Sequence, residues 1–152
     1  MFKKILSVFA VVFALSAYAL PNAASADDGS VHHVIFQINS DDPALMNLVL
    51  NNVENVKSEY ASIGQKVQME VVAYGPGLTM LLADSPVAAR IQNMSAAGDD
   101  VGFAACGNTM KKMSKKAGKD LELLAFSNVK MVPAGVIRVM ELQDKGWHYI
   151  KP

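Results

Sequence analysis

Segments typical of β-strands alternate with segments typical of α-helices along most of this chain. Five runs rich in β-branched and other apolar residues are predicted strands: 31–38, 67–74, 101–105, 129–132 and 147–150. Helical periodicity, with capping residues and glycine stops, predicts helices at 43–63, 86–97, from about 108, and at 136–145. This alternation predicts an α/β fold, a three-layer αβα sandwich around a mostly parallel sheet of about five strands.

The N-terminal segment has the organisation of a cleavable signal peptide. Lys3 and Lys4 precede an apolar run at 5–20, and residues 24–26 form an A-x-A cleavage site. The apolar run is shorter than the roughly 20 residues that a membrane-spanning helix needs. We therefore expect residues 1–26 to be removed on export to the periplasm, leaving a single soluble domain at 27–152.

The charge balance argues against a polyanionic partner. Removing the leader removes two lysines and no acidic residues, so the net charge changes from 0 to −2. Binding to nucleic acid or to an anionic membrane calls for a basic excess. The remaining length is sufficient for one domain with its own hydrophobic core. With one cysteine, the chain can form no internal disulfide, so burial of apolar side chains must hold the fold.

The loops that follow the predicted strands are the expected site of function. In parallel sheets these loops lie at the carboxyl ends of the strands, where ligands bind. Four such loops should converge here: 40–42, 75–77, 106–108 and 133–135. Gly75-Pro76-Gly77 lacks the spacing of a phosphate-binding loop and is typical of a tight turn. Convergence nevertheless makes Gly75, Gly77, Gly107 and Asn108 candidate ligand-binding residues.

The single cysteine, Cys106, stands where the third strand should pass into a helix that starts near Asn108 or Thr109. The free N–H groups at a helix N-terminus stabilise a thiolate, and cysteines placed there can have pKa values of roughly 3.5 to 7.5. Gly107 removes a side chain beside the sulfur, so we expect a sulfur that water can reach. From the residues alone, three interpretations stay open: a small buried side chain, a reactive thiol, or an intermolecular disulfide.

No metal site or cofactor is predicted. His32 and His33 are adjacent on a strand, so their side chains should point to opposite faces and cannot easily share an ion. Cys106, Met110 and Met113 are soft ligands of the kind that Cu(I) prefers. Methionines at helical spacing are, however, usually core residues. No nucleophile has a histidine beside it, so no hydrolase triad can be assembled.

Four segments of the chain resemble the DsrE/DsrF-like family of sulfur-relay proteins. They are HHVIFQINSDDP at 32–43, VVAYGPGL at 71–78, FAACGNTM at 103–110 and VPAGVIRVMELQDKGWHYIKP at 132–152. The resemblance implies a flavodoxin-like sandwich that assembles into homotrimers or homohexamers. It also implies a cysteine that accepts sulfane sulfur as a persulfide and passes it to a partner, and Cys106 is the residue that matches it.

Two hypotheses of function follow. In the first, Cys106 is the catalytic residue of a periplasmic, sulfurtransferase-like carrier that holds sulfane sulfur as a persulfide and yields it to a thiol protein. In the second, the protein is a noncatalytic oligomeric module that binds a small ligand or a metal, and its cysteine is structural. A hydrophobic content of 51% favours a homo-oligomer in either case.

Overall fold

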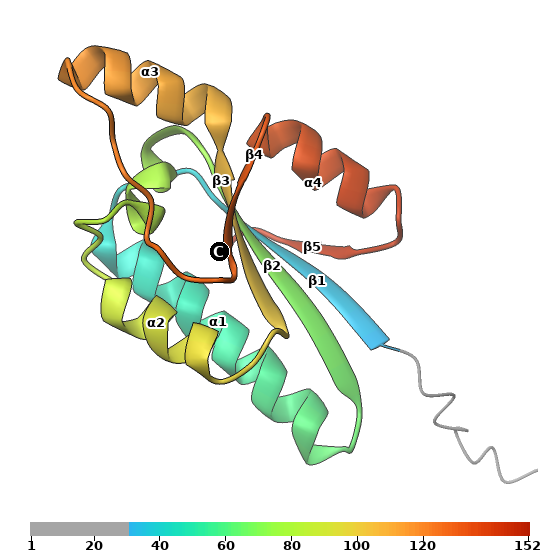
Figure 1. Ribbon diagram of the computed structural model, residues 1–152. Coiled ribbons are helices and arrows are strands. Elements are labelled where there is room, and N and C mark those ends of the chain that lie inside the picture. The colour runs from blue at the N-terminus through green and yellow to red at the C-terminus, as the bar shows by residue number, and fades with distance from the viewer. Residues whose placement is uncertain (1–30) are drawn as a thin grey trace, which may run out of the picture.

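The computed structural model describes residues 31–152, which form one α/β domain (Figure 1). The strands are β1 (Val31–Ile38), β2 (Lys66–Ala73), β3 (Val101–Cys106), β4 (Val129–Val132) and β5 (His148–Ile150). The helices are α1 (Pro43–Ser62), the 3₁₀ helix η1 (Gly75–Leu81), α2 (Ala88–Ala96), α3 (Gly107–Ala117) and α4 (Gly135–Gln143). The predicted signal peptide, residues 1–26, lies outside the described residues.

All five strands are parallel and form one sheet in the order β4-β3-β2-β1-β5. The predicted α/β sandwich and its five-strand sheet are thereby confirmed. Some boundaries differ from the prediction: β3 runs one residue further, to Cys106, and α3 begins immediately at Gly107. The segment at 75–81, predicted as a turn and an apolar run, is the 3₁₀ helix η1. None of the described helices combines the length and the apolar character needed to cross a membrane.

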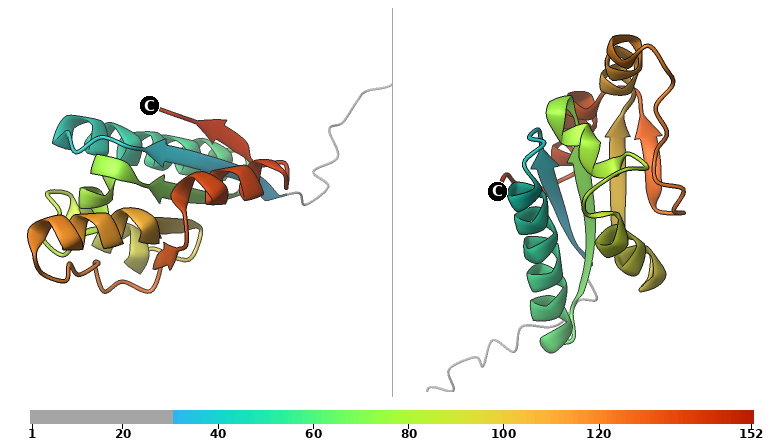
Figure 2. Two further views of the ribbon diagram at one scale, coloured as in Figure 1. Left: turned by 90° about the horizontal axis from the view of Figure 1, so that it is seen from above. Right: turned by 90° about the vertical axis from the view of Figure 1, so that its left-hand side faces the viewer.

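The two faces of the sheet are covered unequally (Figure 2). On the first face, α1, α2 and η1 bury a large core that includes Phe36, Val71 and Phe103. The alternate residues of the same strands point to the second face. There a smaller core forms with Val139 and Leu142 of α4. Because α4 is the main cover of the second face, the way it is attached determines how the carboxyl ends of β2 and β3 are covered.

A bidentate ion pair attaches α4 to the sheet. Both nitrogens of the Arg138 guanidinium fork, Nε and Nη2, donate to the two carboxylate oxygens of Glu70, at 2.7 and 2.6 Å. Glu70 lies on β2, and its side chain is only 14% exposed. This contact raises the pKa of Arg138 above its usual value. Paired guanidinium–carboxylate contacts fix geometry as well as charge, so the pair sets the position of α4 on the second face.

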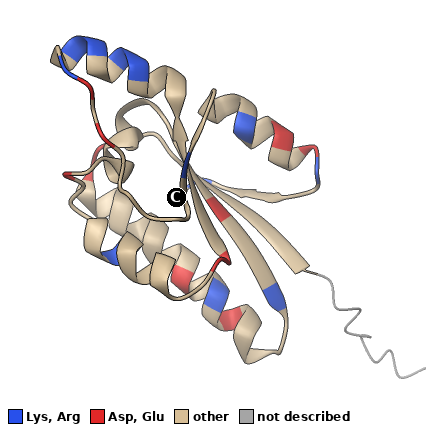
Figure 3. Cartoon of the chain, in the orientation of Figure 1, with Lys and Arg blue, Asp and Glu red and all other residues tan. Residues whose placement is uncertain are grey.

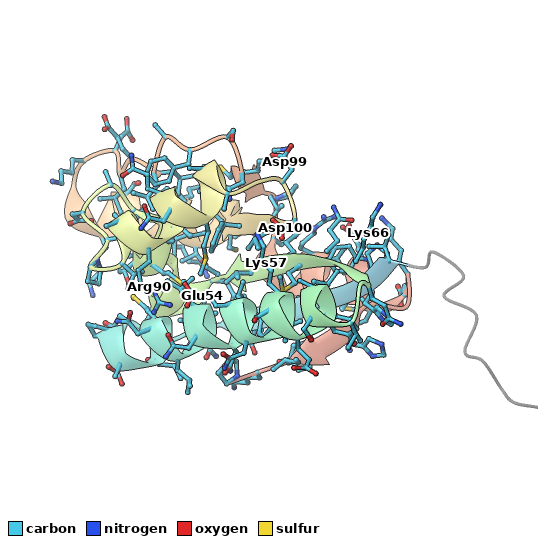
Figure 4. The ribbon with its side chains drawn as sticks, turned by 90° about the horizontal axis from the view of Figure 1, so that it is seen from below. Glu54, Lys57, Lys66, Arg90, Asp99 and Asp100 are labelled. Carbon is cyan, nitrogen blue, oxygen red and sulfur yellow. The ribbon has the colours of Figure 1, made fainter. Side chains whose placement is uncertain are left out.

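On the first face, two further ion pairs link α1 to its neighbours (Figure 4). Glu54 pairs with Arg90 of α2 at 2.8 Å, and Lys57 pairs with Asp100, just before β3, at 2.7 Å. Exposed pairs of this kind stabilise a fold by about 1 kcal/mol or less each. The apolar core, rather than these charges, therefore accounts for most of the stability of this layer.

Gly77 allows η1 to lie against the end of β1. A Cβ atom at position 77 would stand 2.6 Å from the carbonyl oxygen of Ile38 and 2.9 Å from the Cα of Asn39. Both are backbone atoms, which cannot rotate away. The segment 75–81 can follow β2 at this distance only because residue 77 has no side chain.

We predict that Gly77→Ala destabilises the protein by about 1–3 kcal/mol, the usual cost of overpacking a close contact. Gly102→Ala is the matched control, because a Cβ at Gly102 would meet nothing closer than 3.9 Å. Urea unfolding followed by circular dichroism measures both. Equal unfolding free energies for the two variants would contradict this account of η1.

Candidate functional site

Cys106 is the last residue of β3 and the N-cap of α3, so it lies at the strand-to-helix junction that the sequence predicts. It is aligned with Val132 at the end of β4. Its side chain belongs to the second face of the sheet, the face that α4 covers. The expectation of a sulfur open to water is wrong for the single chain, because Cys106 is only 5% exposed.

Of the loops predicted to converge, those after β2, β3 and β4 are joined by hydrogen bonds beside this residue, and the end of β1 is joined to the end of β2. The N–H of Tyr74 donates to the carbonyl of Ile38 at 3.2 Å, which joins the ends of β1 and β2. The N–H of Gly75 donates to Oγ1 of Thr109 at 3.0 Å, which ties the loop after β2 to α3. The N–H of Asn108 donates to the carbonyl of Pro133 at 3.2 Å and ties α3 to the loop after β4.

Gly135, the first residue of α4, lies against the cysteine. A Cβ atom on Gly135 would lie 3.3 Å from the Cβ of Cys106 and 2.9 Å from Cδ1 of Tyr74. Residues 106 and 135 each stand at the beginning of a helix, α3 and α4. The sulfur therefore lies where two helix N-termini come together.

The surroundings of the sulfur act on its ionisation in opposite directions. Burial is the largest influence and by itself raises the pKa of the Cys106 thiol. The hydroxyl of Thr109 and the N–H groups of Gly135, Thr109 and Asn108 favour the thiolate. Together they outweigh burial, so the pKa lies below its ordinary value. No contact from the thiol has the geometry of a capping hydrogen bond to α3, so the N–H groups act mainly as nearby dipoles.

Several of the candidate ligand-binding residues have a role in packing or backbone hydrogen bonding. A Cβ atom on Gly107 would stand 3.2 Å from the carbonyl oxygen of Val132, so a glycine fits closely there. The N–H of Asn108 already donates to the carbonyl of Pro133. Gly77 is buried, so we propose no ligand contact for it. Gly75 adopts a positive φ of 54° and is partly exposed beside Thr109. A ligand-binding role for Gly75, Gly107 and Asn108 stays a prediction.

Sequence reasoning missed three residues of the site: Tyr74, Thr109 and Gly135. Burial raises the pKa of Tyr74, as do Tyr149 and, to a lesser extent, Cys106, whereas Gln37 lowers it. The hydroxyl of Tyr149 donates to Oε1 of Gln37 at 2.6 Å. A row of polar groups thus runs along the second face from the thiol outward. Gly135 belongs to the loop at 133–135 that the sequence predicts at this edge of the sheet, but its approach to Cys106 depends on the tertiary fold.

Among residues 31–152, His32 and His33 lie on opposite faces of the sheet and Met110 lies in the core. The ring of His32 packs against Tyr60 and that of His33 against Trp147, in tilted arrangements with ring centroids 4.2 and 4.8 Å apart. The two imidazoles therefore point to opposite faces, as expected. Met110 is buried in the core of the first face. Within residues 31–152, no three or more His, Cys, Asp or Glu side chains are placed to hold a metal ion.

We predict that Thr109→Val raises the pKa of Cys106, because it removes the hydroxyl that favours the thiolate. The pH dependence of iodoacetamide labelling measures this as an upward shift of the midpoint. Below that midpoint the variant reacts more slowly, in proportion to its smaller thiolate fraction. Thr79→Val is the control, since the hydroxyl of Thr79 donates instead to the carbonyl of Pro76. Identical midpoints for the wild type and Thr109→Val would refute this role.

Comparison with known proteins gives the family that the sequence segments resemble. The DsrE/DsrF-like family model matches residues 14–152. Among solved structures, the protein of unknown function MTH1491 from Methanobacterium thermoautotrophicum is similar, with 31% identity and a TM-score of 0.65. The alignment covers 80% of this chain and 99% of that protein. No curated protein matches the sequence significantly. With its parallel sheet and its family match over nearly the whole length, the chain belongs to the DsrE/DsrF-like family.

Proposed function

We propose that this protein carries sulfane sulfur as a persulfide on Cys106. Membership of the DsrE/DsrF-like family favours a function of the sulfur-relay type. The observation that carries the proposal is the meeting of α3 and α4 at the sulfur, with a thiol pKa below its ordinary value despite burial. A thiolate is the nucleophilic form of cysteine, and the same N–H groups would favour the anionic persulfide.

The proposed loading step is a displacement at sulfur. The Cys106 thiolate attacks the outer sulfur of thiosulfate, a new S–S bond forms, and the bond within thiosulfate breaks with its electron pair leaving on sulfite. The product is the anionic Cys106 persulfide. In the delivery step, an acceptor thiolate attacks the outer sulfur and Cys106 leaves as the thiolate, so no external oxidant or reductant is needed.

The burial of the sulfur should limit the rate at which Cys106 is loaded. Since Cys106 is 5% exposed, a donor reaches it only when its cover opens. The first turn of α4 is part of that cover, because Gly135 lies beside the cysteine. Once loaded, a persulfide in this position would be shielded from water and from other thiols. The geometry therefore fits a carrier whose cysteine is loaded slowly and whose persulfide is protected once formed.

We predict that incubation with thiosulfate or polysulfide adds about 32 Da to the intact protein, the mass of one sulfur atom carried as the persulfide of a thiol. Peptide mapping should place the adduct on Cys106, and Cys106→Ala should show none. The adduct should disappear on treatment with dithiothreitol. A native protein that gains no mass and also resists iodoacetamide, while the urea-unfolded protein is alkylated, would exclude the carrier function.

The burial of Cys106 also favours a second candidate function, a noncatalytic binding module with a structural cysteine. A side chain that is 5% exposed can be kept simply for its volume and packing. Under this alternative, Cys106→Ala leaves assembly and ligand binding unchanged. Under the carrier function, the same variant folds but cannot be loaded.

We further propose that the protein is exported to the periplasm. The support is the leader-like sequence at 1–26, with Lys3 and Lys4 before an apolar run and an A-x-A site before Asp27. The intact mass of the chain recovered from the periplasm reports on this directly. A chain beginning at Asp27 is expected, and a full-length chain confined to the cytoplasm would overturn the proposal.

The outer surface of α4 supports assembly into a homo-oligomer, in a family that includes oligomeric proteins. Val136, Ile137 and Met140 lie on adjacent positions of this helix and are 55%, 49% and 55% exposed. Large apolar side chains gathered on one exposed face are typical of a protein–protein contact. We propose that this surface joins copies of the chain in a trimer or hexamer.

We predict that Ile137→Lys combined with Met140→Lys reduces the mass measured by light scattering from that of an oligomer to that of a monomer. The added charges would have to be desolvated in the interface. Leu48→Lys on α1 is the matched control, because Leu48 is equally apolar and 44% exposed but lies on the other side of the sheet. A monomeric wild type, or an oligomer unaffected by the double substitution, contradicts the assignment.

A further inference from the structure

A groove of about 750 Å³ lies between η1 and α3. We call it the η1–α3 groove. Gly75 and Pro76 line it on one side and Thr109 and Met113 on the other, with Leu82 and Leu121 completing an apolar lining. The volume is within the range of pockets that hold small molecules, and a mainly apolar lining with a few polar groups is typical of them.

The groove follows one side of α3 away from the cysteine. Thr109 marks one end, and Met113 and Lys116 follow at one-turn intervals. At 1.5 Å per residue, the distance from Thr109 to Lys116 along the helix is roughly 10 Å. At its beginning the groove is separated from the sulfur by Thr109, whose Oγ1 accepts the N–H of Gly75. A bound molecule would therefore be elongated and would not need to touch Cys106.

The basic and the acidic residues that line the groove come from different elements. Lys112 and Lys116 line it along α3, and both are exposed. Figure 3 shows that α3 carries only basic side chains among its charged residues. Asp41, the acidic lining residue, follows β1, next to β2, so it lies at the end near Gly75. An anion would avoid Asp41 and pair with the two lysines.

We propose that the η1–α3 groove binds a small amphipathic anion, an apolar chain ending in a sulfonate or carboxylate. The chain lies on Leu82, Met113 and Leu121, and the anionic group faces Lys112 and Lys116. Burial of the chain supplies the affinity, and the charges supply the orientation. This site goes beyond the sulfur-carrying function and does not depend on it.

The probe is octane-1-sulfonate, whose chain is comparable in length to the groove. Binding is followed by NMR of the methionine methyl groups in the folded protein. The signal of Met113 should shift on titration, whereas those of Met131 and Met140, exposed on other surfaces, should not. Octyltrimethylammonium, with the same chain and the opposite charge, should bind at least about tenfold more weakly.

Two double variants test the charges. Lys112→Gln with Lys116→Gln should weaken binding of the sulfonate about tenfold, the sum of two exposed ion pairs. Lys111→Gln with Lys115→Gln changes the same number of charges on the same helix outside the groove, and affinity should stay within about twofold.

Three outcomes overturn the proposal: equal affinity for the cationic probe, undiminished binding by the Lys112 and Lys116 variant, or shifts at Met131 and Met140 without a shift at Met113. Cys106→Ala separates this site from the proposed chemistry of the thiol. The variant should bind octane-1-sulfonate as the wild type does, even though it can carry no sulfur.

Discussion

The contact between the first turn of α4 and the ends of β2 and β3 is the constraint on which the rest of the site depends. Only glycine fits at position 135, because a Cβ there would stand 2.9 Å from the ring of Tyr74. A side chain at position 135 would push the first turn of α4 away from Tyr74 and strain the second core, which holds Val139 and Leu142. The environment of Cys106 and the packing of the second layer thus both depend on this glycine, together with the Glu70–Arg138 pair.

Much of the fold could be predicted from the sequence because its signals are local. The strand at 31–38, the cap at Asp42 with Pro43 behind it, and the apolar strand ending at Cys106 each depend on a few adjacent residues. The side chain of Asp42 does accept the N–H of Ala44, at 2.8 Å. The exception is η1. Its shape depends on contact with β1 through Gly77, which no local pattern reveals.

The candidate site was less predictable for the same physical reason. The position of Cys106 at a strand-to-helix junction follows from neighbouring residues, and it is confirmed. Its burial depends on Gly135 and α4, which lie far along the chain and reach the sulfur only through the tertiary fold. The ion pair between Glu70 and Arg138 also depends on residues that are far apart in the sequence. Glu70 alternates with apolar residues on β2, but its partner is supplied by a helix 68 positions away.

The enclosure of the only cysteine also bears on how the protein would behave among oxidants. A disulfide requires the Cα atoms of two cysteines to come within roughly 4.4 to 6.8 Å. With Cys106 buried at the junction of β3, α3 and α4, each copy would have to open before the two residues came that close. Covalent dimers are therefore opposed by steric exclusion as long as the fold stays closed.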